Sequence, residues 1–246
     1  MRDPSQPMRI AIDATTWAPN RTGVGLYTER LIRAWQTLPY GDELILLTNR
    51  FAELPAQSGL AVHGPPMPIR AAWLQTALPL QLVRFRPNVA LFPNYLAPIL
   101  PVPGVPYVLT VHDLAVFLYP ETFTFKKRVL QRAALPFLVQ RAAAIVTPSA
   151  NSRRDLLRLM PTAPDKVVVT PLAAAPGLDR VPDDDTAARV RQALRLPARY
   201  VLSVGTLEPR KNLIRLIEAF ERIAAHHPDV QLVIAGGKGW RDDDIL

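Results

Sequence analysis

Short apolar runs rich in Val, Ile and Leu alternate along this chain with longer segments of helical periodicity. The alternation predicts a parallel sheet covered by helices, because a strand that is buried on both faces reads as an almost continuous apolar run. The expected strands are residues 9–13, 43–48, 89–92, 107–111, 144–147 and 167–170. The expected helices are residues 25–36, 71–85, 125–141 and 151–159. One doubly wound α/β domain therefore accounts for the first part of the chain.

The composition changes after residue 170, where prolines, a glycine and an acidic run follow one another. Such a stretch is typical of a linker. The pattern then restarts with a strand at 200–204, a helix at 212–226 and a strand at 231–235. We expect a Rossmann-like domain over residues 8–172, a linker and domain junction over 173–198, and the start of a second Rossmann-like domain over 199–246. This second domain is expected to be incomplete, because one β-α-β unit needs neighbouring strands and helices to bury its faces.

Composition excludes several classes of protein. The chain has 49% hydrophobic and 20% charged residues, as folded globular proteins do, and it has no cysteine. Disulfides, thiolate metal sites and a cysteine nucleophile are therefore excluded. No apolar run approaches the roughly 18 residues of a membrane span. The polar residues within 1–9 do not suit a signal peptide, so a cytoplasmic location is expected.

The formal net charge of +8 has two interpretations: affinity for phosphate-bearing partners or anionic lipid, or high arginine usage in the source genome. Nucleic acid is not an expected partner, because the arginines are spread along the chain without a nucleic-acid-binding motif. Residues 123–128 form a denser cluster of aromatic and basic side chains, and Arg132 follows one helical turn beyond Arg128. This cluster is either a peripheral contact with an anionic membrane or an ordinary solvated helix start.

Polar residues follow several expected strands directly, and in an open parallel sheet ligands bind at the carboxyl ends of the strands. Asp13 ends the first strand, Asn94 and Tyr95 follow the third, and His112 and Asp113 follow the fourth. An imidazole, a carboxylate and an amide are thus expected at the same edge of the sheet. His112 and Asp113 are the candidate catalytic residues, against the alternative that the histidine is structural.

Two further segments combine glycine with a helix start. Gly23 and Gly25 stand in a loop that opens a helix, where free amides can face an anion or where the chain merely turns tightly. The dinucleotide-binding fingerprint requires glycines at other positions, which disfavours an NAD-dependent oxidoreductase.

The segment 204–212, Val-Gly-Thr-Leu-Glu-Pro-Arg-Lys-Asn, places two cations between an expected strand and a helix start. Fixed positive charge beside a helix amino terminus suits a nucleotide diphosphate. Farther on, glycines near a strand end let the backbone approach a ligand closely, and a lysine adds a cation. The candidate donor-binding residues of these two segments are Gly205, Thr206, Arg210, Lys211, Gly236, Gly237 and Lys238.

Two acidic runs, 183–185 and 242–244, superficially match the Asp-x-Asp element of metal-dependent transferases. The first falls in the expected linker, and the second falls at an expected helix start, where carboxylates favour the helix dipole. We therefore expect no metal site and no cofactor.

These motifs together resemble the family 4 glycosyltransferases, the large retaining group with the GT-B fold of two Rossmann-like domains. The resemblance covers nearly the whole chain and is most specific in 204–212 and in 232–240, Leu-Val-Ile-Ala-Gly-Gly-Lys-Gly-Trp. It implies that Gly23 and Gly25 lie near the donor phosphates and the acceptor. It also implies that His112 lies near the donor sugar, and that Arg210 and Lys211 bind the diphosphate.

The sequence departs from the family pattern at two points. Many relatives carry Arg where Thr206 stands. The family's later pair of glutamates, spaced eight apart, has no counterpart in these residues: Glu218 and Glu221 are too close together and lie on the preceding expected helix. This departure is the second reason to expect an incomplete donor domain.

The resemblance implies transfer of a hexose, with mannose as a candidate, from a nucleotide-diphosphate sugar to a glycan or glycolipid acceptor, with retention of anomeric configuration. The enzyme would be cytoplasmic, with peripheral contact at the inner face of the cell membrane as a further expectation. The alternative is a non-catalytic protein that binds an acceptor or a membrane and lacks a functional donor half.

Overall fold

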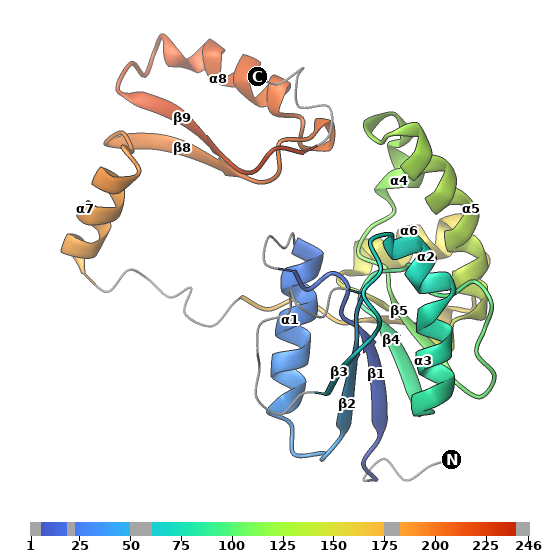
Figure 1. The fold of residues 1–246 in the computed structure, drawn as a ribbon. Helices are drawn as coiled ribbons and strands as arrows, with labels where there is room; N and C mark the ends of the chain where they lie inside the picture. The colour runs from blue at the N-terminus through green and yellow to red at the C-terminus, as the bar shows by residue number, and fades with distance from the viewer. Residues whose placement is uncertain (1–5, 19–22, 50–60, 175–182, 240–246) are drawn as a thin grey trace. The chain divides into compact units, whose positions relative to one another are not determined.

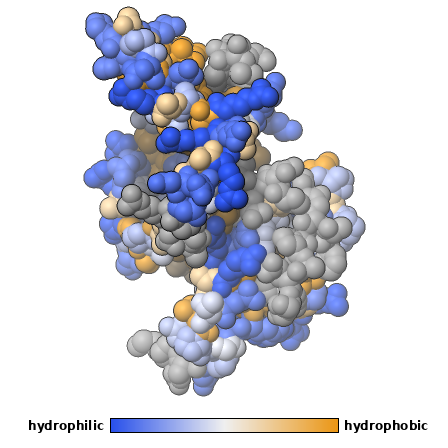
Figure 2. Space-filling view, turned by 90° about the vertical axis from the view of Figure 1, so that its left-hand side faces the viewer, coloured by the Kyte–Doolittle hydropathy of each residue, from blue (hydrophilic) through white to orange (hydrophobic). Residues whose placement is uncertain are grey.

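The computed structural model describes residues 6–18, 23–49, 61–174 and 183–239. The chain divides into two compact units (Figure 1). Unit 1 consists of Met1–Ala115 and Val129–Leu172, and unit 2 consists of Val116–Arg128 and Ala173–Leu246. Hydrophilic residues predominate on the face of the molecule seen in Figure 2, with hydrophobic residues scattered among them.

Unit 1 is built on a seven-stranded sheet in which every neighbouring pair of strands is parallel. Its strands are β1 (Arg9–Asp13), β2 (Glu43–Leu47), β3 (Ala61–His63), β4 (Val89–Phe92), β5 (Tyr107–Thr110), β6 (Ala144–Thr147) and β7 (Val167–Val169). Their order is β3-β2-β1-β4-β5-β6-β7. The order reverses between β1 and β4, and this switch point is where an open sheet leaves a crevice at the carboxyl ends of its strands.

The helices α1 to α6 follow strands of this sheet, and Figure 1 has α1 on one side of the strands and α3 on the other. They are α1 (Gly23–Gln36), α2 (Arg70–Gln75), α3 (Ala77–Phe85), α4 (Ala115–Leu118), α5 (Phe125–Arg141) and α6 (Ala150–Leu159), with short 3-10 turns η2 (Pro120–Thr122) and η3 (Pro164–Lys166). One core cluster joins β1, β2 and β4 to α1 through Ile10, Ile12, Ile32, Leu44, Leu46 and Leu91.

The expected helix over 71–85 is divided in two at Thr76. Pro79 lies in the first turn of α3, where its missing N–H is tolerated, and a continuous helix would set its ring against the carbonyl of Gln75. The hydroxyl of Thr76 donates to the carbonyl oxygen of Ala72 at 2.8 Å. The prediction of one long helix was therefore wrong at this point.

Unit 2 contains a two-stranded parallel sheet of β8 (Arg199–Val204) and β9 (Val230–Ala235), paired in register over six residues each. The turn η4 (Pro209–Lys211) and the helix α8 (Leu213–Ala224) lie between these strands in the sequence. A further helix, α7 (Asp184–Ala193), lies within the predicted linker. Its N-cap is Asp183, whose carboxylate accepts a hydrogen bond from the backbone N–H of Thr186 at 2.6 Å.

The first acidic run therefore starts a helix, whereas the sequence prediction placed this run in a linker. The hydrogen bonds between Asp183 and Thr186 lower the pKa of the Asp183 carboxyl. The second run, 242–244, lies outside the described residues. Within the residues that the structure covers, no three His, Asp or Glu side chains gather as potential metal ligands. Among the described helices, none combines the length and the apolar character that crossing a membrane requires.

Candidate functional site

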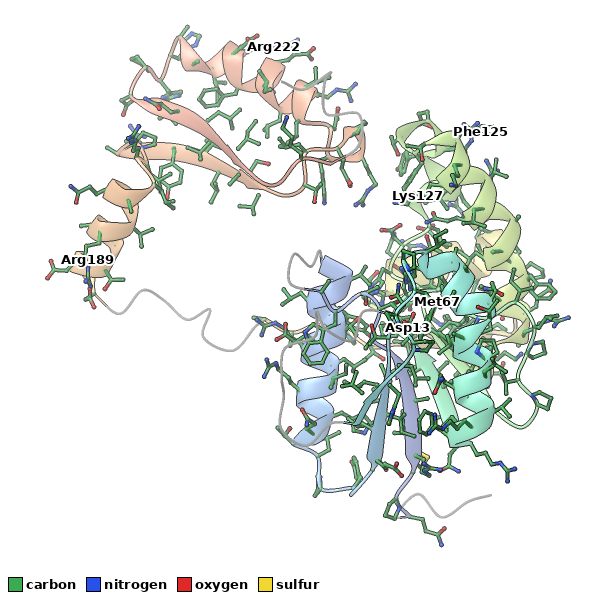
Figure 3. The ribbon with its side chains drawn as sticks, viewed as in Figure 1. Asp13, Met67, Phe125, Lys127, Arg189 and Arg222 are labelled. Carbon is green, nitrogen blue, oxygen red and sulfur yellow. The ribbon has the colours of Figure 1, made fainter. Side chains whose placement is uncertain are left out.

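A buried ion pair stands at the carboxyl end of β1, next to the switch point. The carboxylate of Asp13, whose side chain is 0% exposed, accepts a hydrogen bond from the guanidinium of Arg70 at 3.0 Å. The other oxygen of Asp13 accepts from the backbone N–H of Thr15 at 3.0 Å and from its hydroxyl at 2.6 Å. Arg70 also donates to the Thr15 hydroxyl at 2.6 Å. The three side chains therefore form one closed polar network at the sheet edge (Asp13 is labelled in Figure 3).

The segment between β3 and α2 brings Arg70 to this edge. Gly64 adopts a φ of +139°, and a Cβ there would stand 2.0 Å from the carbonyl oxygen of Thr48, so only glycine fits. The amide of Asn49 then donates to the carbonyl oxygen of Met67 at 2.7 Å. The chain is thus held across the end of β2 and enters α2 with Arg70 facing β1. Nothing in the local sequence signals this pair, since its members are 57 residues apart.

His112 follows β5 and is held on three sides. Its Nε2 lies 2.8 Å from the carbonyl oxygen of Pro93, which can only accept, so Nε2 carries the proton. The ring of Tyr27 packs edge-on against the imidazole at a centroid distance of 4.9 Å. Ser152 donates its hydroxyl to the backbone carbonyl of His112 at 2.8 Å. Burial lowers the pKa of His112, and this effect outweighs the opposing influence of the Pro93 carbonyl and of Asp113.

The neutral tautomer that results presents Nδ1 as a hydrogen-bond acceptor. Such an imidazole can accept a proton or a hydroxyl hydrogen bond near neutral pH. The backbone of His112 is also fixed by the start of α6, where Ser149 caps the helix by accepting from Ser152 N–H at 3.0 Å.

Asp113, Tyr95 and Asn94 lie at the same edge as His112. Asp113 is exposed, and its carboxylate accepts a hydrogen bond from the backbone N–H of Ala115 at 3.0 Å. Burial and the charge of Asp113 raise the pKa of Tyr95, while the charge of Arg70 acts in the opposite direction. The Asn94 side-chain oxygen is buried and has no hydrogen-bond partner among the described residues. The carboxyl edge thus gathers an imidazole, two carboxylates, a guanidinium and an amide.

Gly23 and Gly25 both belong to α1, which begins two residues earlier than predicted. Gly23 is exposed, and a Cβ at this position would meet nothing within 4 Å. Gly25 is buried. The preceding residues 19–22 lie outside the described residues. Of the two glycines, Gly23 therefore stands where a ligand has room to approach the backbone.

In unit 2, the loops that follow β8 and β9 bond to each other. The N–H of Leu207 donates to the carbonyl oxygen of Gly237 at 3.0 Å. A Cβ at Gly236 would stand 1.8 Å from the carbonyl oxygen of Gly205, so Gly236 makes room for the neighbouring loop. At Gly237 a Cβ would meet nothing within 4 Å. Gly237 is therefore the glycine of this loop whose backbone a ligand can reach.

The two adjacent cations of the turn η4 are held differently. Arg210 donates from Nε and Nη2 to one oxygen of Glu208, at 2.9 and 2.7 Å, and the Glu208 side chain is 4% exposed. The side chain of Lys211 lies against Gly205, where a Cβ would stand 3.5 Å from the lysine Cε. Asn212 begins α8 at a positive φ of 54° and makes no side-chain capping bond. The first amides of α8 are thus not capped by Asn212.

The remaining predicted donor residues lie in the same two loops. Thr206 is partly buried after β8, and its methyl group would stand 2.9 Å from a Cβ at Gly239. Lys238 is exposed and forms an isolated parallel bridge with Leu207. The structure therefore brings together Gly205, Thr206, Arg210, Lys211, Gly236, Gly237 and Lys238 at the carboxyl ends of β8 and β9.

Comparison with known proteins gives a consistent result. Residues 21–176 match Glycosyltransferase Family 4, and residues 184–243 match Glycosyl transferases group 1. Over 139 residues the chain is 31% identical to the O-antigen chain mannosyltransferase B of Escherichia coli, covering 55% of this chain and 36% of that protein. Over 148 residues it is 32% identical to a D-inositol 3-phosphate glycosyltransferase of Acidothermus cellulolyticus, covering 54% of this chain and 31% of that protein.

The chain thus matches about a third of the length of these curated relatives. Crystal structures of Anabaena Alr3699/HepE are similar in fold. The complex with UDP and glucose has a TM-score of 0.67 at 21% identity, and the complex with UDP-glucose has a TM-score of 0.69 at 17% identity. Each match covers 96% of this chain and 63% of the other. The predicted α/β fold of the GT-B type is confirmed.

Proposed function

Because the chain belongs to Glycosyltransferase Family 4, we propose that it takes part in transfer of a hexose from a nucleotide-diphosphate sugar to a glycan or glycolipid acceptor, with retention of anomeric configuration. In this proposal residues 8–172 form the acceptor-side domain. Residues 173–198 form the junction, and residues 199–246 belong to the donor domain. The observation that carries the proposal is the turn from β8 into α8, where a lysine stands beside a helix amino terminus without a side-chain cap.

This turn has the properties that a diphosphate requires. The amino terminus of α8 presents backbone N–H groups and the positive end of the helix dipole. Lys211 adds a full charge beside Gly205, and Gly237 leaves its backbone open to a ligand. These groups can stabilise the negative charge that develops on a departing nucleotide diphosphate. The ligands of the Anabaena structures, UDP and UDP-glucose, support a uridine nucleotide as the first donor to test.

In unit 1 we propose that His112 positions the donor sugar and that Asp113 assists it. The neutral imidazole offers an acceptor at Nδ1 for a sugar hydroxyl. Its ring is fixed by Pro93 and Tyr27, and its backbone carbonyl is held by Ser152. Gly23 would let the acceptor or the donor phosphates approach the start of α1. Full transfer activity of a correctly folded His112→Ala variant would return this histidine to a structural role.

The acceptor follows from the relatives only as a class. One relative is named for the O-antigen chain, which supports a growing polysaccharide or its lipid-linked form, and mannose is then the first hexose to test. A lipid-linked acceptor would place the enzyme at the inner face of the cell membrane. In the described part of unit 2 the proposed donor contacts come from one turn and one loop. We therefore also propose that efficient transfer requires donor contacts beyond this turn and this loop.

Titration calorimetry with UDP and GDP tests the donor site. Lys211→Ala should weaken binding by about 1.5–3 kcal/mol, or at least about tenfold in Kd, since hydrogen bonds to charged groups contribute this much. The matched control is Arg222→Ala, which removes a cation at the other end of α8 (Figure 3) and should leave Kd unchanged. Equal losses in both variants would show a nonspecific charge effect. No binding of either nucleotide by the folded chain would favour the non-catalytic alternative.

A further inference from the structure

Helix α5 carries apolar side chains on two faces. Leu135, Leu138 and Val139 are buried on one face, together with the polar Gln131. Toward the start of the helix, Phe125 is 72% exposed, Val129 is 50% exposed and Leu130 is 49% exposed. Phe125 and Val129 are one helical turn apart and so lie on one side of the helix. We call Phe125, Val129 and Leu130 the outer face of α5.

Basic side chains border this outer face. The helix sequence Phe-Lys-Lys-Arg-Val-Leu-Gln-Arg-Ala-Ala-Leu-Pro-Phe-Leu-Val-Gln-Arg contains no acidic residue. Lys126 is exposed, and the guanidinium of Arg128 lies over the ring of Phe125 at 5.5 Å. The ammonium of Lys127 lies over the ring of Phe123 at 5.1 Å. Both Phe125 and Lys127 are labelled at the start of α5 in Figure 3.

This placement of charge does not serve the helix itself. Cations in the first turn of a helix face the positive end of its dipole and lower helix stability by tenths of a kcal/mol or more at exposed positions. The exposed Phe, Val and Leu side chains likewise gain nothing from water. An anionic surface that also accepts apolar side chains removes both costs at once.

We propose that the outer face of α5 docks on an anionic lipid surface. Phe125, Val129 and Leu130 would enter the boundary between headgroups and acyl chains, and Lys126 with its basic neighbours would contact the lipid phosphates. Lipid fits better than an acidic protein, because exposed apolar and basic side chains lie together at the start of one helix, which is typical of helices that lie in the plane of an anionic bilayer. The docking is independent of the transfer chemistry.

Vesicle sedimentation with the full chain tests the docking. Vesicles of phosphatidylcholine alone are compared with an equal mixture of phosphatidylcholine and phosphatidylglycerol, and only the mixture should bind. Phe125→Ser should lower the partition coefficient about tenfold by removing a buried ring. Lys126→Gln should lower it about fivefold, the effect of one basic residue near the surface. The matched controls, Leu100→Ser and Arg30→Gln, change an exposed apolar and an exposed basic residue outside α5 and should bind as the unchanged chain does.

Several results would overturn the proposal. Equal binding to both kinds of vesicle would show that the outer face does not select anionic lipid, and binding to neither would show that it has no affinity for lipid. The same loss in Leu100→Ser as in Phe125→Ser would show nonspecific adsorption. Self-association in light scattering that Phe125→Ser abolishes would assign the face to a second copy of the chain. Nucleotide affinity, measured separately, reports on the donor site and not on this surface.

Discussion

The ion pair between Asp13 and Arg70 can be tested by a double-mutant cycle, with Asp13→Asn, Arg70→Gln and the combined variant. Asp13 accepts three hydrogen bonds, and two of them come from Thr15. Arg70→Gln leaves those two in place, and the Arg70 side chain is 27% exposed, so water can enter. We therefore expect a loss of about 2 kcal/mol, near one hydrogen bond to a charged group. The loss should stay below the roughly 3–5 kcal/mol of an ion pair that is fully buried on both sides.

Asp13→Asn should cost more than Arg70→Gln. It removes the negative charge beside the guanidinium of Arg70 and can place the amide NH₂ group opposite hydrogen-bond donors. The expected loss of unfolding free energy is about 3 kcal/mol. The combined variant lacks both charges, so no charge is left there without its partner. The loss in the combined variant should then be smaller than the sum of the two single losses by about 1–2 kcal/mol, and this difference is the coupling energy of the pair.

Urea unfolding followed by tryptophan fluorescence measures these losses in the relevant unit. Three of the four tryptophans, Trp17, Trp35 and Trp73, lie in unit 1, and Trp17 and Trp73 are buried. The matched control is the cycle of Arg9 and Glu43, an exposed pair at 2.7 Å that should show no measurable coupling. Losses for Asp13 and Arg70 that add to within about 0.5 kcal/mol would refute the reasoning, since independent sites behave in that way.

Two further predictions concern a glycine pair and a histidine. Gly236→Ala should destabilise unit 2 in thermal unfolding, because its Cβ would stand 1.8 Å from a carbonyl oxygen. Gly237→Ala should keep the stability and weaken UDP binding, because a Cβ there would meet nothing within 4 Å. Equal melting temperatures of the two variants would contradict this prediction. Because burial lowers the pKa of His112, the unfolded chain binds this proton at a higher pH than the folded chain, so stability falls as pH decreases below the ordinary histidine value of about 6.5. His112→Gln should flatten the decline in unfolding free energy between about pH 7 and 5. The pKa of His63 is lowered as well, so this histidine should still contribute to the decline in the His112→Gln variant. A slope equal to that of the unchanged chain would show that His112 contributes none of the decline.

The sheet of unit 1 was largely predictable from sequence. Buried parallel strands need apolar side chains on both faces, so β1, β4 and β6 stand out, and their observed bounds equal the predicted ones. Strand β3 was missed because its three residues form no apolar run. Helix α7 was missed because its polar sequence resembles a linker, and only the capping contact of Asp183 identifies its start.

The candidate site was predictable only where it follows from strand ends. His112 and Asp113 lie within three residues of the end of β5, so their position at the carboxyl edge was implied once the sheet was recognised. Arg70 reaches the same edge from a distant segment, through a loop whose path depends on the positive φ of Gly64 and on the contact of Asn49 with Met67. Such a path is set by tertiary contacts and leaves no pattern in the sequence around Arg70.

The turn from β8 into α8 shows why two adjacent cations should not be given equal weight. Arg210 is bound to the buried carboxylate of Glu208 by two nitrogens of its guanidinium, so its charge is largely balanced. Among the described residues no carboxylate forms an ion pair with Lys211, whose stem lies against Gly205. The net positive charge of the turn is therefore carried mainly by Lys211. The sequence shows the three residues but not which cation Glu208 binds, and in the proposed donor site that choice determines which side chain is left to attract a diphosphate.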